Sequence, residues 1–153
     1  MNSLSPARRR DLLLHFLPQA RYVDVELRAA AELRAVLEAA EARRVQRIIS
    51  IHDFYRTPNE SELKTLFKSA HALRPDIFKI VTRTDTEEDM DRLIRFFTEN
   101  KKRMSISAMG TGTKGRDTRI ELARRGSALN YAHLGTHQVD GQLSLAELRR
   151  LIR

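Results

Sequence analysis

Cysteine is absent from this chain of 153 residues. Disulfides, thiolate metal sites and a thiol nucleophile are therefore excluded, and redox conditions do not restrict the compartment. No apolar run approaches the roughly 20 residues that a membrane-spanning helix needs, so no membrane partner is expected. The N-terminal residues also lack the charged and apolar segments of a signal peptide. These absences make the cytoplasm the expected location.

Aromatic residues are scarce, at 6% of the sequence, and they do not alternate with basic residues although the net charge is +8. The arginines are scattered over expected helix faces, and the chain has no helix-turn-helix or RNA-binding signature. The charge excess therefore indicates solvated helix surfaces, and no nucleic-acid partner is expected. An apolar content of 41% and a charged content of 31% are typical of a folded protein. At this length, residues 1–153 are expected to form a single domain.

Short β-type runs recur at intervals of roughly 25 residues, the length of a strand and the helix that follows it. Five strands are expected, at residues 22–26, 47–52, 77–81, 105–109 and 130–134. Apolar residues at helical spacing lie between them, and a further helix is expected at residues 6–17, before the first strand. Strands that alternate with helices predict an α/β fold with parallel strands and right-handed crossovers.

Capping signals agree with this order of elements. Thr57-Pro58 with Glu60 is a start signal for one helix. Ser144 with Glu147 has the spacing of a capping box and is expected to open the last helix.

Two architectures fit five parallel βα units preceded by one helix: an open doubly wound sheet, or part of a (β/α)8 TIM barrel. No Gly-x-Gly-x-x-Gly sequence follows a strand, which disfavours the dinucleotide-binding version of the open sheet. The glycine-rich loop at residues 109–115 lacks Walker spacing. In both architectures the functional groups collect at the carboxyl ends of the strands.

Lys79 lies inside an apolar strand, and His52 closes the strand before it. A buried ammonium needs a partner or must lose its proton, and the neutral amine is a nucleophile. Histidine can supply the proton transfers that Schiff-base chemistry requires. Each residue alone has an ordinary explanation, as a structural histidine or as a lysine whose head group lies in water. Neighbouring parallel strands lie about 4.8 Å apart, however, so the two side chains are expected to reach one substrate.

The motifs around these two residues resemble those of type I 3-dehydroquinate dehydratase. The family has an Asp-hydrophobic-Glu strand, which corresponds to Asp24-Val25-Glu26. Its next strand ends in Ser-x-His-Asp-Phe with Thr-Pro shortly after, and its following strand carries Lys-Ile. Further similar segments follow in the same order: Ser50 to Phe54, Thr57-Pro58, Lys79-Ile80-Val81, Met109-Gly110 with Thr118-Arg119, Gly126-Ser127 and Gly141-Gln142.

The resemblance implies a lyase that dehydrates 3-dehydroquinate to 3-dehydroshikimate in the shikimate pathway, without a metal or organic cofactor. Lys79 would form an imine with the substrate ketone, and His52 would act as general acid and base. Arg119 would bind the substrate carboxylate, and Gln142 a hydroxyl or the carboxylate. Gln138 stands where the family has a substrate-binding serine. Supporting roles fall to Met109 and to Asp24 and Glu26, which share one face of a strand and are expected to form hydrogen bonds inside the barrel.

The resemblance also implies that the chain corresponds to the last five βα units of the family's eight. Early arginines that bind substrate and the glutamate that orients the catalytic histidine are therefore expected to be missing. A five-stranded portion of a barrel has open sheet edges, and a homodimer is expected to cover them. Two alternatives are a smaller sheet shielded by the helix at residues 6–17, and a place within a longer polypeptide. Two other functions stay open: an inactive relative that serves as a folding or interaction module, and a different Schiff-base lyase of the aldolase type.

Overall fold

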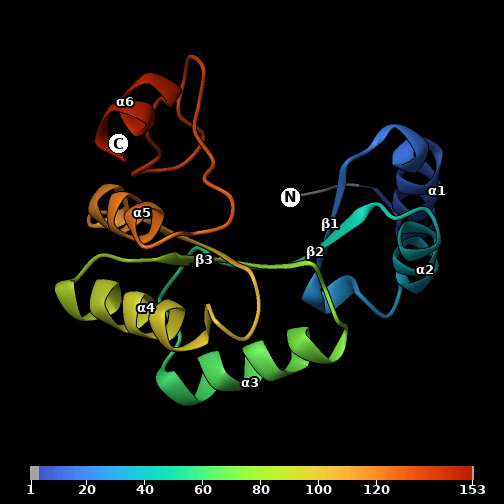
Figure 1. Cartoon of the computed structure of the whole chain (residues 1–153), viewed down its shortest axis with the longest axis horizontal. Helices are drawn as coiled ribbons and strands as arrows, with labels where there is room; N and C mark the ends of the chain where they lie inside the picture. Colours follow the sequence, from blue (N-terminus) through green and yellow to red (C-terminus); the bar gives the residue numbers. More distant parts are fainter. Residues whose placement is uncertain (1–3, 153) are drawn as a thin grey trace.

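The computed structural model describes residues 4–152, and within them four parallel strands form one sheet in the order β1-β2-β3-β4. The strands are β1 (Tyr22–Glu26), β2 (Gln46–Asp53), β3 (Ile77–Arg83) and β4 (Ile106–Thr111). The helices are α1 (Pro6–Phe16), α2 (Arg34–Ala42), α3 (Glu60–Ala72), α4 (Glu87–Asn100), α5 (Gly115–Arg124) and α6 (Leu145–Leu151). Helices α2 to α5 follow one another around one side of the strands (Figure 1). The α/β fold with parallel strands is confirmed, and in the described residues no helix has the length and apolar content to span a bilayer.

The prediction of a fifth strand at residues 130–134 is wrong. This segment forms only an isolated bridge, between His133 and Ser144. The residues just before it are joined to β4 by single hydrogen bonds: the Ala128 N–H donates to the Ile106 carbonyl at 2.8 Å, and Ser107 Oγ donates to the Leu129 carbonyl at 2.7 Å. Leu134 is 90% exposed, so the segment has no buried apolar face that would hold it as a strand.

The start of α3 also differs from the expectation. Its N-cap is Asn59, whose side chain accepts from the Glu62 N–H, while the Glu62 carboxylate accepts from the Asn59 N–H. Thr57 and Pro58 lie just before this capping box. The expected box at Ser144 and Glu147 is confirmed at the start of α6.

The outer face of the sheet carries the apolar core, which packs against the helices. Alternate strand residues such as Val25, Ile49 and Ile80 are buried on this face. At its centre the Phe78 ring meets Phe67 of α3 edge-on, with 6.0 Å between ring centroids. Because strand side chains alternate between faces, the residues between these core positions point to the inner face. That face is where the polar residues of the strands gather.

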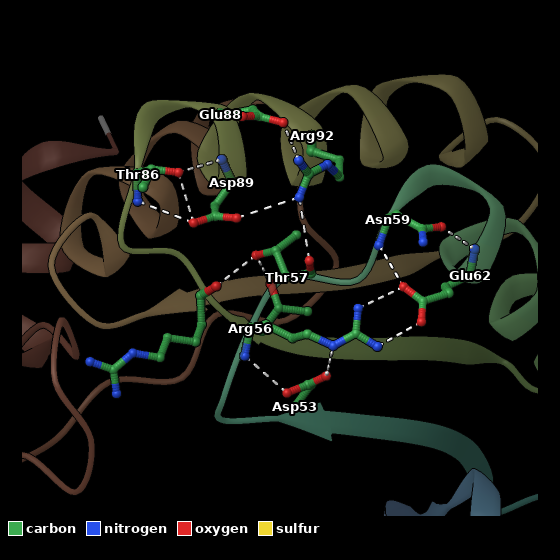
Figure 2. A network of polar contacts seen from close by, with 11 residues as sticks. Asp53, Arg56, Thr57, Asn59, Glu62, Thr86, Glu88, Asp89 and Arg92 are labelled. Atoms are coloured by element: carbon green, nitrogen blue, oxygen red, sulfur yellow. Dashed lines mark hydrogen bonds and ion pairs between the residues drawn. The ribbon is translucent and has the colours of Figure 1, made fainter.

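The loop from β2 to α3 begins after Asp53, the neighbour of His52, and is held by a polar network (Figure 2). Asp53 Oδ1 accepts the N–H of Tyr55 at 3.0 Å and that of Arg56 at 3.1 Å. The Arg56 guanidinium makes two bonds to the Glu62 carboxylate, at 2.6 and 2.7 Å. The loop is therefore fixed both to the end of β2 and to the first turn of α3.

The same loop is fastened to the next βα unit. Thr57 Oγ1 donates to the Arg83 carbonyl at 2.7 Å, and Arg92 of α4 donates to the Thr57 carbonyl at 3.3 Å. Arg92 also bonds to Glu88 and Asp89 on its own helix (Figure 2). These contacts hold the carboxyl ends of β2 and β3 together, which is the end of the sheet where the polar residues lie.

The Arg56–Glu62 contact makes the stability of this loop depend on pH. Hydrogen bonds from the Arg56 side chain and the Asn59 N–H lower the pKa of Glu62 from 4.5 to about 2. A carboxylate whose pKa is lower in the folded state stabilises the fold above its unfolded pKa, and that contribution is lost as the pH falls. We expect Glu62→Gln to keep the capping bond, which glutamine also makes, while removing this dependence between pH 4.5 and about 2.

Urea unfolding of parent and variant at several pH values in this window checks the expectation. The parent should lose more stability than Glu62→Gln as the pH falls, by a modest amount because the ion pair is exposed. The matched control is Glu99→Gln, since Glu99 is exposed and forms no ion pair among the described residues. Identical pH profiles for parent and Glu62→Gln would contradict the assignment.

Candidate active site

Strand register brings the expected catalytic residues to one face of the sheet. Glu26 pairs with Ser50, and Ser50 pairs with Lys79. His52 follows Ser50 by two positions and therefore points to the same face as Lys79. Met109 lies on this face of β4, beside Val81, and is 2% exposed. The amine and the imidazole thus come from neighbouring strands, and Met109 is a buried apolar residue on the same face of the sheet.

His52 is held by a carboxylate from β1. Its Nδ1 contacts Glu26 Oε1, and its ring stacks on Phe54 with 5.7 Å between centroids. An ionised carboxylate only accepts hydrogen bonds, so Nδ1 carries the proton and Nε2 presents its lone pair. Glu26 was expected only to form hydrogen bonds inside the barrel, and the structure places its carboxylate against His52.

Lys79 is held on two sides. Its Nζ donates to Asp24 Oδ2 at 2.8 Å and lies 4.6 Å from the centroid of the Tyr131 ring. The lysine side chain is only 11% exposed. Its head group is therefore enclosed by a carboxylate and an aromatic ring, as a poorly hydrated ammonium requires.

Arg119 lies within α5, not at its start, and is 6% exposed. Its Nε donates to the Gly110 carbonyl at 2.7 Å, and its Nη1 to the Tyr131 carbonyl at 3.3 Å. Burial lowers the pKa of Arg119 to about 10, so the guanidinium is still charged at neutral pH. The side chain links the end of β4 to the segment that carries Tyr131.

Gln138 and Gln142 lie together in the loop before α6. The Gln138 N–H donates to Gln142 Oε1 at 2.8 Å. Gly141, just before Gln142, has φ +80°, and a Cβ there would lie 2.7 Å from the Arg116 nitrogen. Only glycine allows this approach, which sets the backbone at Gly141, just before Gln142, against the first turn of α5.

Three residues near His52 and Lys79 were given no role at the site from the sequence. Tyr131 fell inside the expected fifth strand, and nothing distinguished it from a packing residue. Phe54 belongs to a recognised motif, but its contact with His52 depends on the fold of the loop. Ser50 Oγ is buried between Glu26 and Lys79 in register, without a hydrogen-bond partner in the described structure.

Within residues 4–152, no cluster of three potential metal ligands is present.

Known proteins resemble the chain in sequence. A model of the type I 3-dehydroquinase family matches residues 2–153. The chain is 37% identical over 131 residues to a 3-dehydroquinate dehydratase of Thermococcus onnurineus, covering 86% of this chain and 59% of that protein. It is 34% identical over 153 residues to the Pyrococcus abyssi protein of the same name, covering 98% and 68%. The chain thus spans roughly three fifths of the length of these relatives.

Solved structures agree in fold. The 3-dehydroquinate dehydratase of Geobacillus kaustophilus superposes with a TM-score of 0.90 at 24% identity, over 97% of this chain and 60% of that one. The type I enzyme of Clostridium difficile gives 0.89 at 25% identity, over 99% and 62%. The four-stranded sheet therefore corresponds to part of a TIM-barrel-like structure. Taken with the match along almost its whole length, this places the chain in the type I 3-dehydroquinase family.

Proposed function

We propose that this chain dehydrates 3-dehydroquinate to 3-dehydroshikimate through a Schiff base on Lys79, with His52 as general acid and base. One observation carries the proposal: the amine and the imidazole share one face of neighbouring strands, and each is held by a carboxylate of β1. The names of the relatives support the substrate. Because the chain covers 59% of one relative and 68% of another, its own activity needs a direct test.

The first step joins Lys79 to the substrate ketone. Nζ, as the neutral amine, adds to the carbonyl carbon, and the oxygen leaves as water after it has taken up protons. The product is a protonated imine, in which Nζ keeps a positive charge. This charge withdraws electrons and makes the hydrogens on the neighbouring carbon acidic.

The second step belongs to His52. Its Nε2 removes a proton from the carbon next to the iminium, and the electron pair moves toward Nζ to give an enamine. The enamine then expels the hydroxyl group on the following carbon, which leaves as water with the proton that His52 returns. Hydrolysis of the imine frees the product and restores Lys79. Glu26 supports both transfers because it accepts from Nδ1 and stabilises the imidazolium that forms.

The remaining residues bind the substrate anion in this proposal. Arg119 provides positive charge and the N–H groups that its backbone contacts do not use. Gln142 and Gln138 provide amide groups for a substrate hydroxyl or the carboxylate. Met109 provides a buried apolar surface on the same face of the sheet as Lys79. Together these groups would orient a small anionic ring near the amine of Lys79.

Borohydride trapping tests the assignment of Lys79. With 3-dehydroquinate present, we expect reduction to give the mass of a covalent adduct on Lys79 in the parent protein. Lys79→Met should give no adduct and no turnover, because the nucleophile is gone. His52→Ala should still form adduct at reduced yield while dehydration is abolished. Mass spectrometry of tryptic peptides and absorbance of the conjugated product measure the two steps separately.

The same experiment separates the alternatives. Absence of an adduct in the folded parent would favour a module without catalytic activity. An adduct with other ketones only would favour a lyase of the aldolase type. Turnover by His52→Ala equal to that of the parent would exclude His52 as the base.

Glu26 provides a second test, through the pH profile. We expect Glu26→Gln to lower kcat by about ten- to a hundredfold with little change in KM, because the amide oxygen can still accept from Nδ1 but lacks the negative charge that stabilises the imidazolium. The acidic limb of the kcat profile should move as well, which a purely structural defect would not cause. Glu32→Gln is the matched control, since Glu32 is exposed and has no ion pair among the described residues. Unchanged kcat in Glu26→Gln would remove Glu26 from this role.

We also propose that a second copy of the chain covers the open edge of β1, which ends the strand order in the described sheet. An unpaired edge offers backbone donors and acceptors to another chain. Sedimentation velocity over a range of concentrations should give a dimer. A strictly monomeric sample with a sharp, cooperative unfolding transition would contradict this proposal.

A further inference from the structure

Ser50 is a buried polar residue without a partner on the inner face of the sheet. It is 1% exposed, and its Oγ has no hydrogen-bond partner in the described structure. In register it stands between Glu26 of β1 and Lys79 of β3. A buried hydroxyl without a partner is unfavourable, so the presence of a serine here needs an explanation other than hydrogen bonding.

The other polar side chains of this row are paired. Ser107 of β4 stands in the same row, beside Lys79, and its Oγ donates to the Leu129 carbonyl at 2.7 Å. Glu26 and Lys79 have partners of their own, on the strands next to or beyond Ser50. The hydroxyl of Ser50 therefore takes no part in the polar contacts that hold the row together.

The ion pair of Lys79 extends across the strand that carries Ser50. Lys79 is on β3, Asp24 is on β1, and β2 lies between them. Asp24 stands beside Ile48, whereas Lys79 stands beside Ser50, so the pair also runs diagonally by two residues. At about 4.8 Å per strand and about 3.3 Å per residue, the two Cα atoms are about 12 Å apart. An aspartate side chain is short, so the lysine chain spans most of this distance and lies along the inner face of β2.

The size of residue 50 limits this path. On the inner face of β2 the lysine passes between the side chains of Ile48 and Ser50, and it is itself only 11% exposed, so it lies close to the sheet. Ile48 is large and 2% exposed. The space for the lysine therefore comes from the small side chain of Ser50. Because protein interiors are close-packed, one more methyl group at this position would displace a neighbour.

We infer that Ser50 is a positioning residue for Lys79: its small side chain leaves the passage through which the lysine reaches Asp24. The inference rests on the proposed Schiff-base function. In this passage Nζ is held beside the strand that carries His52, where both groups can reach one substrate. A larger side chain at position 50 lifts the lysine away from Asp24 and moves Nζ out of this place. The volume of residue 50 thus matters to the reaction, and its hydroxyl does not.

Two variants separate the volume from the hydroxyl. Ser50→Ala lacks the hydroxyl and is no larger, whereas Ser50→Thr keeps the hydroxyl and adds a methyl group. We expect Ser50→Ala to form the borohydride-trapped adduct with 3-dehydroquinate at the parent rate, and to melt at the same or a higher temperature because an unpaired buried hydroxyl is gone. Ser50→Thr should form the adduct at least about tenfold more slowly, since a misplacement of about 1 Å can cost about a hundredfold.

Reductive methylation with formaldehyde and cyanoborohydride measures the accessibility of Lys79 without the substrate. We expect Lys79 to be methylated several times faster in Ser50→Thr than in the parent or Ser50→Ala, because the displaced amine leaves its enclosure. Peptide mass spectrometry follows the modification. Lys68, an exposed lysine of α3, is the internal reference, and its rate should be the same in all three proteins.

A parent rate of adduct formation in folded Ser50→Thr would overturn the inference. So would a large loss in Ser50→Ala, since that result would assign the effect to the hydroxyl. Thermal melts show whether each variant is folded. If Ser50→Thr does not fold, Ser50→Ala decides: the parent rate supports the inference, and a loss overturns it.

The methylation measurement separates this inference from the proposed function. No adduct of the folded parent with 3-dehydroquinate would defeat the proposed function, while faster methylation of Lys79 in Ser50→Thr alone would still support the positioning role of Ser50. An adduct in the parent, together with equal methylation of Lys79 in all three proteins, would support the proposed function and overturn the inference.

Discussion

Two carboxylates on one short strand determine the arrangement of this site. Asp24 and Glu26 are two residues apart on β1, so both point to the inner face, and they hold Lys79 and His52 respectively. A shift of the register by one residue would turn Val25 toward these groups and leave a poorly hydrated ammonium without its partner. The pairing of β1 with β2 is therefore a condition for the proposed chemistry as well as for the fold.

The outer face of the sheet stabilises the fold, and the inner face carries the groups of the proposed chemistry. The outer face buries aliphatic residues and the Phe78 cluster against the helices, which supplies the hydrophobic driving force. The inner face has charged and hydroxyl-bearing side chains whose burial is unfavourable unless they are paired. Because a rigid core lies directly behind each strand, the paired groups on the inner face stay in a fixed relation, which proximity catalysis requires. The network around Arg56 extends this rigidity to the loop that carries Phe54.

The sequence predicted the elements that have strong local signals and missed what depends on long-range contacts. Four strands and the capping box at Ser144 follow from periodicity and local hydrogen bonding, and they are confirmed. The run at residues 130–134 has strand-like composition, but composition alone does not give it a buried face. The catalytic candidates could be named because a lysine in an apolar strand is unusual. Their partners could not be paired in advance, since Asp24 and Lys79 are 55 positions apart and meet only through the sheet.

The order of residues along the chain also separates the proposed chemistry from the proposed binding of substrate. Both carboxylates, His52 and Lys79 come from β1, β2 and β3, which are consecutive and adjacent in the sheet. The groups proposed to bind the anion come from residues after β4. Arg119 connects the two parts, because its buried guanidinium joins the end of β4 to the backbone of Tyr131, and the Tyr131 ring lies on Lys79. In the proposed mechanism the covalent centre therefore contacts a residue of the irregular C-terminal segment, so this segment would belong to the catalytic centre as well as to the walls around the substrate.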